Sequence, residues 1–199
     1  MNGDGMGVQA PAVRSGDPYE ALAALEDAVP GLRALRRGTA GRVDWAVVER
    51  GLGTALPGDF KLLAESYPPL LFGDFLSFWT PAAGAEEAWV KATVEEREDV
   101  ADLLDIEDLG GVLAVYPAPG GLLVWGGSNQ GDTFMWTTTG TGPEEWKVTV
   151  GSHHGDWWHY DAGAVQFTAD LISGALRPWG LPRVRPEAVA VSGGTGGEA

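Results

Sequence analysis

The sequence predicts an α+β fold, a single domain in which an antiparallel β-meander packs against helices. Three observations lead to this class. Much of the first half of the chain shows helical spacing of apolar residues, residues 122–161 contain four short runs with strand alternation, and an amphipathic segment follows at residues 163–174. Strands joined by short turns pair with their neighbours, and helices outside such a run pack against the sheet.

Three helices are expected near the start of the folded part. Asp17 as N-cap and Pro18 at the first helical position begin the first helix. The second helix is short, lies in residues 42–50 and ends at Gly51. The third follows Pro57, whose fixed φ suits a first helical turn. Its apolar residues recur with helical spacing and give it one buried face: Phe60, Leu63, Ala64 and Tyr67.

A strand at residues 75–79, a helix at residues 85–105 and the meander follow. The four runs of the meander are residues 122–126, 132–138, 145–151 and 156–161. Alternation places Phe134 and Trp136 on one face of the second run, and Trp146 and Val148 on one face of the third. These two strands can therefore share a buried aromatic surface. The final helix ends at Gly174, a residue suited to a C-terminal cap.

The folded unit is expected to span residues 17–184. Residues 1–16 and 185–199 are small, Gly-rich or weakly apolar, and are predicted to be flexible tails. The chain has no cysteine, its N-terminus lacks the basic start and apolar core of a leader, and it has no apolar run long enough to cross a bilayer. We therefore expect a cytoplasmic protein.

The charge of the chain is strongly negative. Lysine and arginine total 13 against 28 acidic residues, which gives a formal net charge of −15 at pH 7. Such a chain repels nucleic acids and anionic membranes and attracts a basic protein. Residues 86–108 concentrate this charge, because they hold ten carboxylates against only Lys91 and Arg97.

One face of the helix expected at residues 85–105 is a stripe of like charge. Its carboxylates, spaced at i, i+3, i+4, i+7 and i+10, are Glu95, Glu98, Asp99, Asp102 and Asp105. Repulsion within the stripe disfavours the helix by roughly 0.2–0.5 kcal/mol for each i,i+4 pair. Two interpretations stay open: a solubilising surface, or a docking face for a basic partner.

The stretch "WGGSNQGDTFMWTT" at residues 125–138 resembles a phosphate-binding loop, but Asp132 occupies the position of the lysine. The residues after it alternate like a strand, whereas a phosphate loop needs a helix there. We therefore expect a β-hairpin and no nucleotide site. Glycines such as Gly126, Gly127 and Gly131, together with Asn129, supply residues that accept positive φ, and Asp132 can accept hydrogen bonds from turn amides.

Several segments, in this order, resemble the SMI1/KNR4 (SUKH) superfamily. They are "LGTALPGDFKLLAESYPP" at 52–69, "FLSFWTP" at 75–81, "GGLLVWGGSNQGDTFMWTT" at 120–138, a W-x-V-x-V strand at 146–150 and a Phe-x(3)-Leu-x(2)-Gly helix end at 167–174. The resemblance covers roughly residues 40–175. The residues at the family's motif positions, carried over as fold-maintaining, are Leu56, Pro57, Asp59, Gly131 and Asp132.

The resemblance implies a cofactor-free binding domain of α+β fold that is not an enzyme. Bacterial members are chiefly immunity proteins, which neutralise a polymorphic toxin, often a nuclease, as one half of a toxin–antitoxin pair. Eukaryotic relatives regulate cell-wall synthesis and signalling through protein contacts. The resemblance therefore predicts a protein partner, with immunity as the first interpretation and regulation as the second, and the negative charge of the chain predicts that this partner is basic.

The segment "HHGDWWHYD" is the most enzyme-like part of the chain. His153, His154, Asp156, His159 and Asp161 lie within nine positions of one another. Zinc or a hydrolytic pair could use such groups, but neighbouring residues of a strand point to opposite faces and the spacing matches no known ligand motif. We expect a solvated hairpin without metal, and keep a hydrolytic or carbohydrate-binding protein as an alternative.

Nine tryptophans could form either a core or stacking platforms for sugars. Most fall on apolar stripes and are expected in the core: Trp45, Trp79, Trp125, Trp136 and Trp146. Trp157 and Trp158 are adjacent on one strand, so their side chains point to opposite faces. We predict that one of this pair is an exposed anchor for a partner. The alternative is a second covering layer that buries both.

Overall fold

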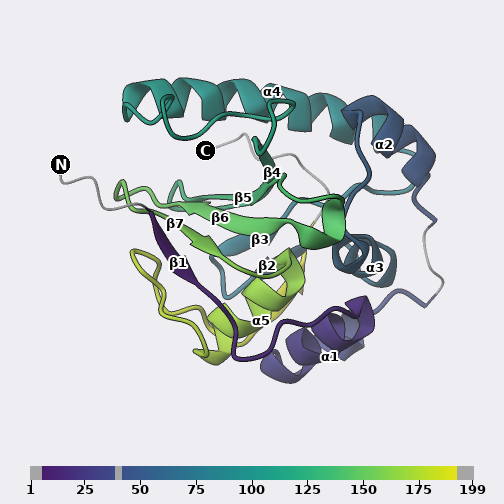
Figure 1. Ribbon diagram of the computed structural model, residues 1–199. Coiled ribbons are helices and arrows are strands. Elements are labelled where there is room, and N and C mark those ends of the chain that lie inside the picture. The colour runs from purple at the N-terminus through teal and green to yellow at the C-terminus, as the bar shows by residue number, and fades with distance from the viewer. Residues whose placement is uncertain (1–5, 39–41, 192–199) are drawn as a thin grey trace.

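An eight-stranded sheet with the order β1-β7-β6-β5-β4-β3-β2-β8 forms the centre of the computed structural model, which describes residues 6–38 and 42–191 (Figure 1). The strands are β1 (Gly7–Gln9), β2 (Leu70–Phe72), β3 (Leu76–Phe78), β4 (Leu122–Ser128), β5 (Thr133–Thr137), β6 (Lys147–Gly151), β7 (Trp157–Tyr160) and β8 (Ala188–Ala190). β1 runs parallel to β7, and the other neighbours are antiparallel. The α+β class and the β4–β7 meander are thus confirmed.

Helices cover both faces of this sheet. They are α1 (Pro18–Ala28), α2 (Trp45–Leu52), α3 (Gly58–Ser66), α4 (Glu86–Ile106) and α5 (Ala164–Ser173), with short 3-10 turns η1 (Leu32–Leu35) and η2 (Pro143–Glu145). α1, α3 and α5 pack on one face, called here the inner face, and α4 lies across the other, the outer face (Figure 1). No helix within the described residues is both long and apolar enough to cross a membrane.

Alternation along the central strands fills two separate cores. Phe134 and Trp136 of β5 face inward, and Phe134 lies with its ring centroid 5.8 Å from that of Phe167 in α5. Met135, between them, faces outward and joins Val100 and other apolar residues of a smaller core under α4. Both cores draw on the same strands. The aromatic surface that was predicted to be shared by the second and third runs of the meander lies on the inner face and is confirmed.

The residues that were expected to start and end the first two helices were predicted correctly for α1, but the end of α2 is shifted. The Asp17 carboxylate accepts a hydrogen bond from the Tyr19 amide at 2.9 Å, and α1 starts at Pro18. Gly51 does not end α2, which continues to Leu52 and stops at Gly53 with φ of 78°. Gly51 instead allows close packing, since a Cβ there would lie 2.8 Å from the side chain of Val90 in α4.

The predicted bounds at residues 17 and 184 are too narrow. Residues 7–9 and 188–190, which fall in the segments predicted to be flexible tails, form the two outermost strands β1 and β8. Gln9 also ties β1 down, because its side chain donates to the Arg177 carbonyl at 2.7 Å and accepts from the Arg177 amide at 2.9 Å. Residues 1–5 and 192–199, the outer parts of both segments, lie outside the described residues.

Candidate functional site

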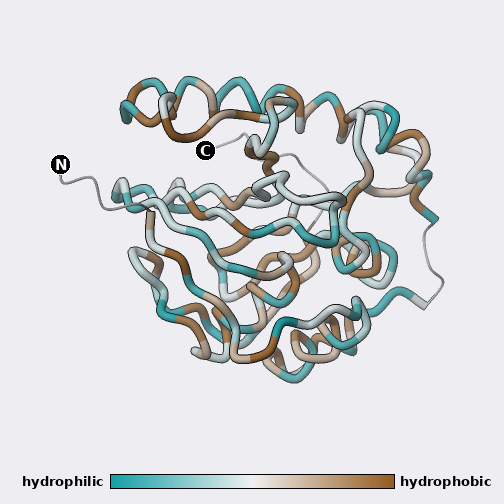
Figure 2. Tube along the Cα trace, viewed as in Figure 1, coloured by the Kyte–Doolittle hydropathy of each residue, from teal (hydrophilic) through white to brown (hydrophobic). Residues whose placement is uncertain are grey.

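The acidic stripe lies on the surface of α4. Glu95, Glu98, Asp99, Asp102 and Asp105 are all exposed. Among the described residues, Glu95 forms the one ion pair of this set, a solvent-exposed contact to Lys91 at 3.4 Å. The tube of α4 changes repeatedly between hydrophilic and hydrophobic colours along its length, as expected for a helix with one solvated and one packed face (Figure 2).

Two adjoining cavities, of about 180 and 320 Å³, lie along the packed side of α4. The first is lined by Trp79, Trp89, Ala92, Thr93, Glu95, Glu96, Asp99 and Val124, and the second by Glu96, Asp99, Val100, Asp102, Leu103, Ile106 and Thr133. Because Glu96 and Asp99 line both cavities, we treat them as one depression, the α4 groove. Carboxylates of the acidic stripe form its rim.

Two indoles form the aromatic end of the α4 groove. The Trp89 Nε1–H of α4 donates to the carbonyl of Trp79 at 3.1 Å, which ties the helix to the end of β3. Trp79 lies against the backbone of β4, where a Cβ on Gly127 would be only 2.7 Å from its ring. Gly127 therefore allows the indole to lie close to the sheet and leaves the space above it open.

Glu96 is the carboxylate in the centre of the α4 groove. Its side chain is half-buried, and within the part of the chain that the structure describes it has neither a hydrogen bond nor an ion pair. Burial raises its pKa, and the nearby charge of Asp99 adds to the effect. The other carboxylates that are not fully exposed all have partners: Glu26, Glu49, Asp59, Glu65, Glu86, Glu107, Asp132, Asp161 and Asp170.

Sequence reasoning missed Glu96 and the two indoles of the groove. A signal was present, since Trp89, Thr93, Glu96 and Val100 recur at i, i+4, i+7 and i+11 on the side of α4 that packs toward the sheet. Glu96 is thus a charged residue within an otherwise packed stripe. In the sequence of this segment, the stripe of like charge is a more prominent signal than this single residue.

The predicted pair of tryptophans lies on opposite faces of β7, but Trp158 is not an exposed anchor. Its side chain is 1% exposed in the inner core, and its Nε1–H donates to the Trp179 carbonyl at 3.0 Å. Trp157 is half-buried and donates to Glu107 at the end of α4, at 2.7 Å. The covering-layer alternative is correct for Trp158, because α5 and the segment around Trp179 close over it.

The tryptophans expected in the core divide into two groups. Trp125, Trp136 and Trp146 are buried, as predicted. Trp45 and Trp79 are only half-buried at the margins of the two cores. Trp45 instead donates from Nε1 to Glu65 at 2.8 Å, and Trp79 borders the α4 groove.

The three histidines of the β6–β7 hairpin do not all meet: the ring centroids of His153 and His154 lie 3.7 Å apart in the turn, whereas His159 lies in β7. His153 Nδ1 lies 2.8 Å from the Asp132 carboxylate, and His159 Nδ1 lies 2.9 Å from the Thr149 hydroxyl. Burial, with help from the charge of Lys147, lowers the pKa of His159. Within the described residues, no three histidine or carboxylate groups lie together as metal ligands would. The Ser128 hydroxyl donates to Asp132, so it is not activated by a histidine base.

Asp132 and Gly131 form the β4–β5 hairpin predicted in place of a phosphate loop. Gly131 has φ of 92°, but Gly126 lies within β4, where a Cβ would be 2.6 Å from the Ser77 carbonyl oxygen of β3. Asp132, 2% exposed, accepts from the Ser128 hydroxyl and from the His153 amide at 3.0 Å. Asp132 therefore accepts from a turn amide, as expected, but that amide belongs to the next hairpin, so Asp132 links two successive hairpins.

Asp132→Ala is expected to lower the free energy of unfolding by about 1–2 kcal/mol, because the His153 amide and the Ser128 hydroxyl lose their acceptor. Burial by itself would raise the pKa of Asp132, but hydrogen bonds from Ser128 and His153 outweigh it and lower the pKa. Urea denaturation without any partner measures the effect. Asp156→Ala, an exposed neighbour, serves as the control. Unchanged stability of Asp132→Ala together with lost partner binding would make Asp132 a contact residue.

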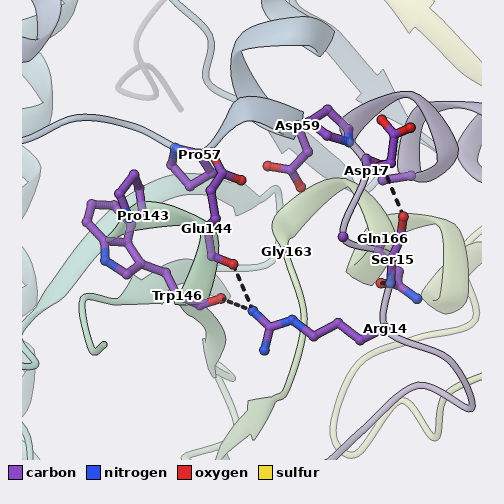
Figure 3. Close-up of a pocket in the computed structure, with 13 residues that line it drawn as sticks. Arg14, Ser15, Asp17, Pro57, Asp59, Pro143, Glu144, Trp146, Gly163 and Gln166 are labelled. Carbon is purple, nitrogen blue, oxygen red and sulfur yellow. Dashed lines mark hydrogen bonds between the residues drawn. The ribbon is translucent and has the colours of Figure 1, made fainter. Parts of the chain in front are cut away.

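Of the remaining motif residues, Pro57 and Asp59 line a small polar cavity of about 90 Å³ between α1, α3 and α5 (Figure 3). Leu56 is buried and Pro57 is the N-cap of α3. The buried Asp59 carboxylate accepts from the amides of Phe60 at 2.7 Å and Val165 at 3.1 Å. Asp59 thus caps the start of α5 from a different helix, which is a fold-maintaining role.

Close approach explains the neighbours of Asp59. A Cβ on Gly163 would overlap the Asp59 carboxylate, so glycine is needed at that position. Burial raises the pKa of Asp59 to about 6, and the negative charge of Glu144 adds to the effect. Two other polar side chains drawn in Figure 3 have partners of their own, since Arg14 donates to the Glu144 carbonyl at 3.0 Å and Gln166 accepts from the Ser15 amide at 2.9 Å. This cavity therefore serves packing.

Comparison of the chain with protein-family models, with curated proteins and with solved structures finds no match. The SUKH resemblance therefore stays a prediction.

Proposed function

We propose that this chain is a non-enzymatic, cofactor-free protein-binding domain that captures a basic partner on α4. The observation that carries the proposal is the set of five exposed carboxylates beside a groove with aromatic and apolar walls. Interfaces combine desolvated aromatic or apolar anchors with charged rims that steer association. α4 offers both features on one element.

The resemblance to the SUKH superfamily extends this proposal to a biological role. We propose that the partner is a toxin domain encoded beside this chain, and that binding neutralises it in the cytoplasm. A regulatory domain of the same fold would use the same surface, so the two roles differ in the consequence of binding. Cells that express the product of the adjacent gene should survive only when this chain is present if the role is immunity, whereas binding without protection indicates regulation.

Reversing charge on α4 is expected to slow association at least tenfold, which lies within the range that electrostatic steering supplies. The variant is Glu95→Lys, Glu98→Lys and Asp102→Lys, and the measurement is surface-based kinetics against the product of the adjacent gene. For the unaltered chain, the on-rate should fall steeply as salt rises from about 50 to 500 mM, because the Debye length shortens. The affinity should fall less steeply with salt than the on-rate.

Glu20→Lys with Asp27→Lys on α1, on the other side of the sheet from α4, is the control, with two charge reversals against the three of the α4 variant (Figure 1). Both side chains are exposed, so these reversals change net charge but leave the α4 surface intact. Circular dichroism of each variant checks the fold. Equal on-rates for the unaltered chain and the α4 variant would exclude steering and leave the stripe as a solubilising surface.

A further inference from the structure

The α4 groove contains a half-buried carboxylate, Glu96, that has no partner within the described residues. Glu96 is half-buried between the indole end and the apolar end of the groove. A carboxylate removed from water is unfavourable unless hydrogen bonds or a cation compensate it. Every other carboxylate of the described residues with comparable burial has such a partner, as shown above. The geometry of Glu96 therefore points to a positive group that comes from another molecule.

We infer that the groove receives an arginine side chain of the partner, with its guanidinium beside Trp79 and Trp89 and bonded to Glu96 and Asp99. This inference rests on the proposed function and names the chemistry that the surface recognises. Glu96 and Asp99 are three residues apart on α4, so they project from the same side of the helix and both line the two cavities. A single planar cation can contact both.

The walls of the groove favour arginine over lysine. A guanidinium is planar, weakly hydrated and able to stack on an indole while it donates paired hydrogen bonds to carboxylates. A lysine ammonium is a compact and strongly hydrated charge, so it gains less from the indoles of Trp79 and Trp89. The cavity at this end, about 180 Å³, is larger than the roughly 30 Å³ that one water molecule occupies, so it has room for a side-chain head group.

The apolar end supplies contacts for the rest of the partner segment. Val100, Leu103 and Ile106 line the cavity of about 320 Å³, and Ile106 is 81% exposed. Partner atoms that cover Val100 and Leu103, the apolar residues of this end that follow Glu96 by one and two helical turns, would also exclude water from Glu96. This strengthens the attraction between the carboxylate and the cation, because charges interact more strongly when they are removed from water.

Three small probes test the inference directly: N-acetyl-arginine amide, N-acetyl-lysine amide and N-acetyl-citrulline amide. Citrulline has nearly the shape of arginine without its charge. The measurement is ¹⁵N NMR of the indole N–H signals, assigned by Trp79→Phe and Trp89→Phe. The arginine probe should produce saturable shifts of the Trp89 and Trp79 signals at millimolar concentration. The lysine probe should bind at least fivefold more weakly, and the citrulline probe should cause no saturable shift.

Glu96→Gln should weaken binding of the arginine probe at least fivefold. Glu98→Gln is the matched control, because it removes the same charge from the same helix outside the groove and should leave the affinity within twofold. Urea denaturation shows that both variants fold. Equal binding of the arginine and lysine probes, unchanged affinity in Glu96→Gln, or no shift with the arginine probe would each overturn the inference.

Different experimental results would contradict the arginine site and the proposed docking surface. Loss of on-rate in the α4 charge-reversed variant, combined with no response to the arginine probe, supports the docking surface and overturns only the arginine site. An unchanged on-rate in that variant, combined with selective binding of the arginine probe, excludes steering by the stripe and supports the arginine site. The two experiments use different substitutions, so neither result depends on the other.

Discussion

Trp158→Ala is expected to lower the free energy of unfolding by about 3–5 kcal/mol, the range for deleting a large buried aromatic side chain. The Trp158 ring lies with its centroid 5.9 Å from that of Phe167 and 5.6 Å from that of Trp179. Its removal leaves a cavity in the inner core and frees the Trp179 carbonyl, which accepts its Nε1–H. Urea denaturation of the isolated protein measures the loss.

Trp157→Ala is the natural comparison, because the neighbouring indole has the same size but is half-buried on the outer face. The Trp157→Ala variant should lose less free energy of unfolding, since part of the Trp157 surface is already in contact with water. Trp158→Phe should recover much of the stability by refilling the cavity. A Trp158→Ala variant that kept full stability but released its partner faster would show that Trp158 is a contact residue after all.

The second large effect concerns Asp59 and pH. Its pKa of about 6 in the folded protein lies above the ordinary value of 3.8. Between these values the folded protein binds more protons at this site than the unfolded chain, so the free energy of unfolding falls as pH rises. The difference of about two pH units corresponds to roughly 3 kcal/mol, which is lost between about pH 4 and pH 7.

Asp59→Asn isolates this contribution because it removes the titration and keeps the size of the side chain. Other carboxylates have the opposite effect: the pKa values of Glu26, Glu86 and Asp132 are lowered, and they favour folding at higher pH. The measured quantity is therefore the stability of the unaltered protein minus that of Asp59→Asn, which should decrease from pH 4 to pH 7. The prediction would be contradicted if the stabilities of the unaltered protein and of Asp59→Asn changed in parallel with pH and NMR titration gave Asp59 a pKa near 3.8.

Elements with strong local signals were predictable from the sequence. Asp17 with Pro18 defined the start of α1, and Gly174 ended α5 in the left-handed conformation. Strand alternation separated Phe134 and Trp136 from Met135 correctly. β1, β2, β3 and β8 have three residues each, which is too short for periodicity to appear, and only β3 was expected, because it lies in the apolar run 75–79. β1 and β8 pair with strands that are distant in the sequence, so a local pattern cannot reveal them.

The candidate site was predictable only in its exposed half. Helical spacing alone placed Glu95, Glu98 and Asp102 on one face of a helix. The groove depends on how α4 lies over β4, which is a tertiary property, so Glu96 was not recognised. Alternation also showed that Trp157 and Trp158 point to opposite faces. It could not show that α5 and the segment around Trp179 cover the inner face there.

The two terminal strands have a consequence for any shortened form of this protein. β1 pairs with β7 and β8 pairs with β2, so a chain reduced to residues 17–184 would lose both outermost strands. The backbone amides and carbonyls of β7 and β2 would then face solvent without partners. Such open strands offer pairing sites to further copies, which is how many β-proteins aggregate. In the complete sheet, strands of only three residues at both margins leave little backbone for another molecule to extend.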